Sequence, residues 1–130
     1  MRFIPTRIHG WMDYTVGALL AVAAWVLGFS QNGMESWVPL VLGLGTIGYS
    51  LFTDYECGYT RRLSMRTHLA LDFASGLLLA VSPWLFGFAD RVWVPHLVIG
   101  LFEMAVALTT STVPGITRLV PLRVERTRRP

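Results

Sequence analysis

Two short motifs each place a histidine and an aspartate four residues apart in apolar surroundings. They are His9 with Asp13 and His68 with Asp72. A spacing of four residues puts both side chains of a motif on one face of a helix. Imidazole nitrogens and carboxylate oxygens are common ligands of divalent metals, so four such groups brought together predict an ion or small-ligand site. The alternative is structural, with each Asp near the start of its helix interacting with the helix dipole and pairing with Arg7 or Arg66.

His96 and Glu103 form a second candidate pair, seven residues apart on one helix face. Glu103 lies near the middle of an apolar segment, where an ionised carboxylate costs roughly 3 kcal/mol. We therefore expect it to be protonated or to accept hydrogen bonds from Tyr14, Thr46 or Ser50. Together with the His/Asp motifs, this pair predicts either a ladder of titratable groups that conducts protons or ions, or a polar clamp between helices.

Other chemistry is disfavoured. Haem ligation by His9 and His68 is not expected, because both are placed at the membrane boundary rather than in the core. No serine, nor Cys57, has a histidine and an acid in a convincing catalytic pattern, so neither an enzymatic activity nor a cofactor is expected. The run from Gly43 to Gly48 spells the dinucleotide-binding fingerprint, but it lies inside an apolar segment without a preceding strand and therefore predicts helix packing.

The composition indicates a membrane protein. The chain has 130 residues, enough for one domain, of which 53% are hydrophobic and 15% charged, whereas soluble domains carry about 25% charged residues. Every basic residue is an arginine, and the arginines cluster beside the apolar segments. This placement predicts contact with anionic lipid headgroups and not with nucleic acid.

Four apolar segments approach the length of about 20 residues that crosses a bilayer as a helix. They are Trp11–Phe29, Trp37–Thr53, Leu69–Phe88 and Val92–Val113. The central connection, residues 54–68, carries three arginines, whereas the outer connections carry only Arg91. The positive-inside rule therefore predicts a multi-pass protein of a bacterial inner membrane with both termini in the cytoplasm.

The two halves of the chain resemble each other. The segment from Arg7 to Asp13 matches Arg66 to Asp72, 59 residues later, and Trp37-Val-Pro39 matches Trp93-Val-Pro95. Each copy holds an even number of spans, so both insert the same way round. The predicted fold is all-α: a four-helix transmembrane bundle of two tandem helical hairpins, 7–53 and 66–113, related by a pseudo-two-fold axis along the membrane normal. We expect a single membrane domain, 1–130, that ends in a basic cytoplasmic tail, 114–130.

Small residues follow each aspartate at helical spacing, beginning with Gly17 after Asp13 and Gly76 after Asp72. Small residues let membrane helices approach closely, and ionisable residues in a span normally face protein. Both arguments predict that these faces point into the bundle.

The chain also resembles the SPW-repeat family of small bacterial membrane proteins. Ser82-Pro83-Trp84 carries the motif of the name, and the first copy departs from it with Ala23-Ala24-Trp25. The resemblance covers nearly the whole chain, and it implies a polytopic membrane fold and no particular biochemical activity.

We therefore expect a non-enzymatic membrane protein with a structural or accessory role. The alternative is an ion or proton conduit, or a binding site for an ion or small ligand. In either case the expected partners are the lipid bilayer and a second copy or another membrane protein. The candidate polar cluster comprises His9, Asp13, His68, Asp72, His96 and Glu103, supported by Arg7 and Arg66, with the identity of any metal open.

Overall fold

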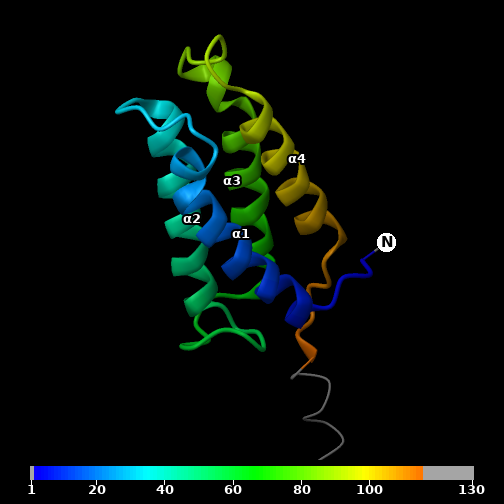
Figure 1. Ribbon diagram of the computed structural model, residues 1–130. Helices are drawn as coiled ribbons and strands as arrows, with labels where there is room; N and C mark the ends of the chain where they lie inside the picture. Colours follow the sequence, from blue (N-terminus) through cyan, green and yellow to red (C-terminus); the bar gives the residue numbers. More distant parts are fainter. Residues whose placement is uncertain (1, 116–130) are drawn as a thin grey trace, which may run out of the picture.

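The computed structural model describes residues 2–115, which form a bundle of four α-helices (Figure 1). The helices are α1 Thr6–Val26, α2 Met34–Phe52, α3 Met65–Leu85 and α4 Val94–Thr109. Apart from two isolated β-bridges, the described residues contain no strand. The predicted all-α four-helix fold is therefore confirmed. Only Pro114 and Gly115 of the predicted basic tail lie within the described residues.

Helices α1 and α3 begin four to five residues before the predicted spans and end earlier. The Ser64 hydroxyl caps α3 by accepting a hydrogen bond from the Thr67 amide at 3.2 Å. Both helices are followed by a glycine in the left-handed region, Gly28 with φ 75° and Gly87 with φ 69°, a conformation that ends helices. The two His/Asp motifs therefore lie inside helices, with His9 and His68 in the first turns.

Helices α2 and α4 also differ from the predicted spans. Helix α2 starts at Met34 instead of Trp37, and α4 is shorter than predicted at both ends. Each is followed by a threonine with extended backbone, Thr53 and Thr110, both with ψ 142°. These two threonines occupy equivalent places after the second helix of each hairpin.

The tightest packing lies within each hairpin, between α1 and α2 and between α3 and α4. A Cβ on Gly43 would lie 2.5 Å from the Gly17 carbonyl oxygen, and one on Gly100 would collide with the Gly76 carbonyl. This contact confirms that the small-residue faces meet a partner helix. Gly45 and Gly48 have no neighbour within 4 Å, so the fingerprint-like run uses only its first glycine for packing in this chain.

Two prolines inside helices leave a carbonyl without its usual donor, and a side chain replaces that donor each time. Pro83 has no N–H for the Leu79 carbonyl, and the Ser82 hydroxyl donates to that carbonyl at 2.7 Å. In the Ser-Pro pair of α3, the serine therefore supplies the hydrogen-bond donor that the proline lacks.

In α2, Pro39 likewise leaves the Glu35 carbonyl free. The Nε2–H of His96, from α4, donates to that carbonyl at 3.1 Å. The proline therefore creates an acceptor that binds the two hairpins together.

The outer surface of the bundle is rich in large apolar side chains. Leu19, Leu44, Leu77 and Leu101 are each about half exposed, on four different helices. Among the described helices, α3 alone is both long and apolar enough to cross a membrane, and α4 is apolar but shorter.

Candidate functional site

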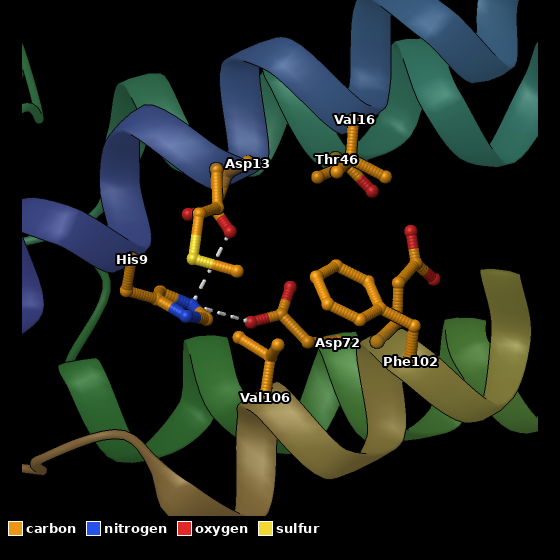
Figure 2. Close-up of a pocket in the computed structure, with 9 residues that line it drawn as sticks. His9, Asp13, Val16, Thr46, Asp72, Phe102 and Val106 are labelled. Atoms are coloured by element: carbon orange, nitrogen blue, oxygen red, sulfur yellow. Dashed lines mark hydrogen bonds and ion pairs between the residues drawn. The ribbon is translucent and has the colours of Figure 1, made fainter. Parts of the chain in front are cut away.

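The two His/Asp motifs meet in one buried cluster between α1 and α3 (Figure 2 shows His9, Asp13 and Asp72). His9 Nε2 lies 3.1 Å from His68 Nε2, 2.9 Å from Asp72 Oδ2 and 3.3 Å from Asp13 Oδ1. His68 Nε2 lies 3.0 Å from Asp13 Oδ2 and 3.1 Å from Asp72 Oδ2. The four side chains are at most 7% exposed. The sequence-based prediction that the motifs come together is confirmed.

The second ring nitrogen of each histidine contacts a threonine of the other hairpin. Thr53 Oγ1 lies 2.8 Å from His68 Nδ1, and it also donates to the Tyr49 carbonyl at 2.8 Å. Thr110 Oγ1 lies 3.1 Å from His9 Nδ1 and donates to the Val106 carbonyl at 2.7 Å.

These contacts assign the ring protons. A carbonyl only accepts, so each threonine gives its single proton to the backbone and must accept from the imidazole. Nδ1 therefore carries the proton in both His9 and His68. In a neutral imidazole the other nitrogen, Nε2, is then an unprotonated acceptor.

When both rings are neutral, two unprotonated Nε2 atoms and two carboxylates point at one another, and only protons or a cation can relieve the repulsion. In a tetrahedral zinc site with bonds of about 2.0–2.1 Å, adjacent ligand atoms are about 3.3 Å apart. The nitrogen–nitrogen and nitrogen–oxygen separations of 2.9–3.3 Å are near this value, although they use both oxygens of Asp13. One ligand atom from each of the four residues gives a set whose members all lie within 4.8 Å of one another. If both Nε2 atoms instead carried protons, two N–H groups would face each other at 3.1 Å.

Hydroxyl groups also donate hydrogen bonds to the two carboxylates. Tyr49 donates to Asp72 Oδ1 at 2.6 Å, and Tyr55 donates to Asp13 Oδ2 at 3.2 Å. Ser50 makes a longer contact with Asp13, at 3.4 Å. Burial raises the pKa of Tyr55 well above its usual value, so this phenol remains a donor. These hydroxyls leave the remaining carboxylate oxygens turned toward the histidines.

The predicted pairing of the aspartates with Arg7 and Arg66 is wrong. Asp13 and Asp72 are each the eighth residue of their helix, too far from its start for the helix dipole to act strongly. Their ionic partners are the two histidines. The expectation that His9 and His68 lie outside the bundle core is also wrong, because both are buried, although both are in the first turns of their helices.

Glu103 lies beside the cluster, in the wall of a small cavity. The cavity has a volume of about 20 Å³, room for one water molecule. His9, Asp13, Asp72 and Thr46 also line it, and Figure 2 shows them around the opening between α1 and α4. Within the described residues, Glu103 Oε2 is buried without a hydrogen-bond partner. The donors expected for it bind elsewhere: Tyr14 to the Cys57 carbonyl, Thr46 with Tyr49, and Ser50 to Asp13.

His96 is not part of this cluster. Its ring packs between Phe29 and Phe88, with centroid distances of 5.6 and 5.0 Å, at the other end of the bundle. Its neighbour Glu35 is 1% exposed and forms an ion pair with Arg91, whose Nη2 lies 3.2 Å from Oε2. The structure thus separates the six predicted residues into an inner group of five and an outer His96.

Cys57 packs against Gly10, one residue from His9. Burial, followed by the charges of Glu56 and Asp13, raises the pKa of its thiol. A neutral thiol is a weak nucleophile and a weak metal ligand, so Cys57 does not compete with the His/Asp cluster.

Several side chains that contact the cluster or join the two hairpins were not predicted from the sequence. They are Thr53, Thr110, Tyr49, Tyr55 and Glu35. The internal repeat could have revealed the threonines, since Thr110 follows Thr53 by 57 residues. Glu35 and Arg91 are also equivalent positions of the repeat, because they are 56 residues apart, as are the two Trp-Val-Pro segments. Equivalent residues near a two-fold axis lie close together, so the repeat could have predicted this pair as well. The tyrosines have no counterpart in the second copy and gave no such signal.

The family model described as "SPW repeat domain" matches residues 7–110, a range that runs from the first motif to Thr110. No curated protein and no solved structure matches the chain.

Proposed function

This chain belongs to the SPW repeat family, and we propose that it is a multi-pass membrane protein that holds one divalent transition-metal ion between its two hairpins. One observation carries the metal: two imidazole Nε2 atoms, from rings whose Nδ1 atoms face threonine acceptors, converge with two carboxylates. The role is non-enzymatic, with the ion joining the halves of the molecule. The structural role and the ion site expected from the sequence then become one function.

Several features support the membrane location and orientation. The family match indicates a membrane-associated protein. Trp25, Trp37, Trp84 and Trp93 are all about half exposed at the end of the bundle formed by the two hairpin turns, as in an aromatic belt. The arginines of the described residues gather at the other end, apart from Arg91, which favours a cytoplasmic position for that end.

The ligand set favours particular metals. Two imidazoles and two carboxylates in a compact tetrahedral arrangement suit Zn²⁺, and Co²⁺ is a spectroscopic substitute with similar demands. A dication beside Asp13 and Asp72 gives a site with no net charge, which a low-dielectric interior favours. The threonine acceptors hold both rings in the metal-binding tautomer, as outer-shell partners do in known sites.

Metal binding to purified protein in detergent tests this function. We expect one Zn²⁺ or Co²⁺ per chain, with the visible absorption of tetrahedral Co²⁺. His68→Gln and Asp72→Asn should each weaken binding by at least about 100-fold, because changes in outer-shell partners alone cost 10–100-fold.

His96→Gln is the matched control, since it removes a buried histidine outside the cluster and should leave metal affinity unchanged. Size-exclusion profiles establish that each variant is folded. Wild-type protein that binds neither metal would show that protons alone hold the cluster, and metal affinity that survives His68→Gln would show that the ion binds at another site.

Glu103 favours a second candidate function, an ion or proton conduit. Its buried oxygen without a partner faces a cavity that also touches His9 and Asp72. An apolar layer lies between this cavity and His96 at the other end of the bundle. It consists of Leu20, Val38 and Leu79, with Ile99 packed against them. A conduit predicts that Glu103→Gln abolishes proton flux in proteoliposomes, whereas a closed metal site predicts no flux in either protein.

A further inference from the structure

We propose that a groove between α3 and α4 binds the phosphate and upper acyl chains of one anionic phospholipid. The groove lies at the end of the bundle that holds the N-terminal segment. The inference rests on the membrane location proposed above and is independent of the metal ion.

The groove has a volume of about 580 Å³, within the range of sites that hold small molecules. Among the described residues that line it, the charged ones are Arg2 and Arg66. The rest of the lining is apolar apart from Thr112, and includes Phe73 and Leu108. Two guanidinium groups beside an apolar trough complement a phosphate diester that carries hydrocarbon chains.

Backbone contacts fix Arg2 at this groove. The Phe3 amide donates to the Thr109 carbonyl at 2.8 Å, and the Ser111 amide donates to the Ile4 carbonyl at 2.9 Å. Arg2 Nη1 donates to the Thr110 carbonyl at 2.7 Å. A guanidinium has five N–H donors, so this bond leaves others for a phosphate.

Arg66 contributes from the opposite side. It is the second residue of α3 and is exposed to the surroundings. The first turn of a helix carries a partial positive charge, which adds to the attraction for an anion.

The first repeat contains the equivalent groove, and there the chemistry is different. Arg7, Trp11 and Tyr14 occupy the positions of Arg66, Ala70 and Phe73, 59 residues apart. This groove measures about 370 Å³ and includes the Glu56 carboxylate. This groove is smaller and holds the Trp11 indole where the other holds the Ala70 methyl group, so we expect the second repeat and not the first to bind the lipid.

Native mass spectrometry of the purified protein tests this inference. The protein is titrated in detergent with phosphatidylglycerol or phosphatidylcholine of identical acyl chains. We expect one phosphatidylglycerol to be retained in preference to phosphatidylcholine. Arg66→Ala and Arg2→Ala should each lower its retention about fivefold, the effect of one arginine near an anionic lipid.

Two further variants use the repeat as a control. Arg7→Ala removes the equivalent arginine and should leave retention unchanged, and Ala70→Trp copies Trp11 and should block binding without altering charge. Equal retention of the two lipids, or an equal loss with Arg7→Ala and Arg66→Ala, would overturn the lipid site. Carbonate extraction of cell membranes reports the membrane location separately, so a failed lipid site is distinguishable from a protein that is not in the membrane.

Discussion

Each histidine of the cluster depends on one threonine for its chemistry. The hydroxyl groups of Thr53 and Thr110 donate their protons to backbone carbonyls, so they accept the Nδ1–H of His68 and His9. This leaves Nε2 free as a ligand. The contacts cross between the hairpins, so each half of the molecule sets the tautomer of the other half's histidine.

Thr110→Val should weaken metal affinity by about 10–100-fold, the usual effect of losing an outer-shell partner. The valine cannot accept the His9 Nδ1–H, so the ring loses its preferred tautomer and orientation. Isothermal titration with Zn²⁺ measures the change. Thr110→Ser restores the acceptor and should recover the affinity.

Thr109→Val is the neighbouring control, because the Thr109 hydroxyl bonds only backbone carbonyls of α4. If Thr109→Val and Thr110→Val weakened binding equally, the effect would belong to the helix end and not to the imidazole.

The sequence could predict the four central residues but not their partners. Histidines and aspartates stand out in apolar segments because burying them is costly, and their repetition doubles the signal. Threonine is common in membrane helices, so neither Thr53 nor Thr110 stands out by type. Glu103 was recognised as unusual, and its seven-residue spacing from His96 on one helix already separates the two by roughly 10 Å. Within the part of the chain that the structure describes, Glu103 Oε2 has no hydrogen-bond donor, which depends on packing between helices that spacing does not specify.

At the scale of single helices, the Ser-Pro pair of α3 explains a difference between the repeats. Pro83 removes the donor for the Leu79 carbonyl, and Ser82 replaces it. In the first copy the corresponding residues are Ala23 and Ala24, where the backbone N–H is present and no replacement is needed. The serine is therefore required only where the proline is present.

Ser82→Ala should destabilise the protein by about 1–3 kcal/mol, because it leaves a buried carbonyl unpaired. The double variant Ser82→Ala/Pro83→Ala recreates the first copy and should recover most of this loss. Thermal or denaturant unfolding in detergent, followed by circular dichroism, measures both. Additive losses in the double variant would mean that the serine acts through something other than the proline.

Helix number and order could be predicted from the apolar segments, but the helix bounds could not. Hydropathy identifies the apolar part of a helix, and it does not detect a first turn that is made of polar residues. Helices α1 and α3 therefore extend beyond the predicted spans through Arg7 and His9 and through Arg66 and His68. The caps at Ser64 and the left-handed glycines define the true ends.

At the scale of the molecule, the two hairpins are internally well packed and are joined by the polar cluster and by an apolar core of Leu20, Val38 and Leu79. Helices α2 and α3 pack against each other moderately, and α1 and α4 hardly at all. The sequence repeat predicted which residues are equivalent. It did not predict this difference in packing; the cavity between α1 and α4 is lined by Thr46 and by its counterpart Glu103.

Metal removal should therefore loosen the association of the hairpins. A ligand that binds only the folded state stabilises it by about 2.7 kcal/mol at a concentration 100 times its Kd. Because the His9, Asp13, His68 and Asp72 cluster is a buried contact between the hairpins, this energy acts at their interface. We expect a chelator to lower the melting temperature of the purified protein and added Zn²⁺ to restore it.

The His68→Gln variant should melt at one temperature with chelator or with Zn²⁺, since it cannot use the ion. The Glu35–Arg91 ion pair lies outside the cluster, so we expect it to be the same in the wild type and in the variant. Because the Arg91 side chain is 53% exposed, this pair contributes little to the melting temperature of either protein. A wild-type melting temperature that ignores the chelator would indicate that packing and shared protons hold the hairpins together. Hydrogen exchange at Thr53 and Thr110 would then remain slow without metal, whereas a metal-dependent interface predicts that exchange there accelerates first.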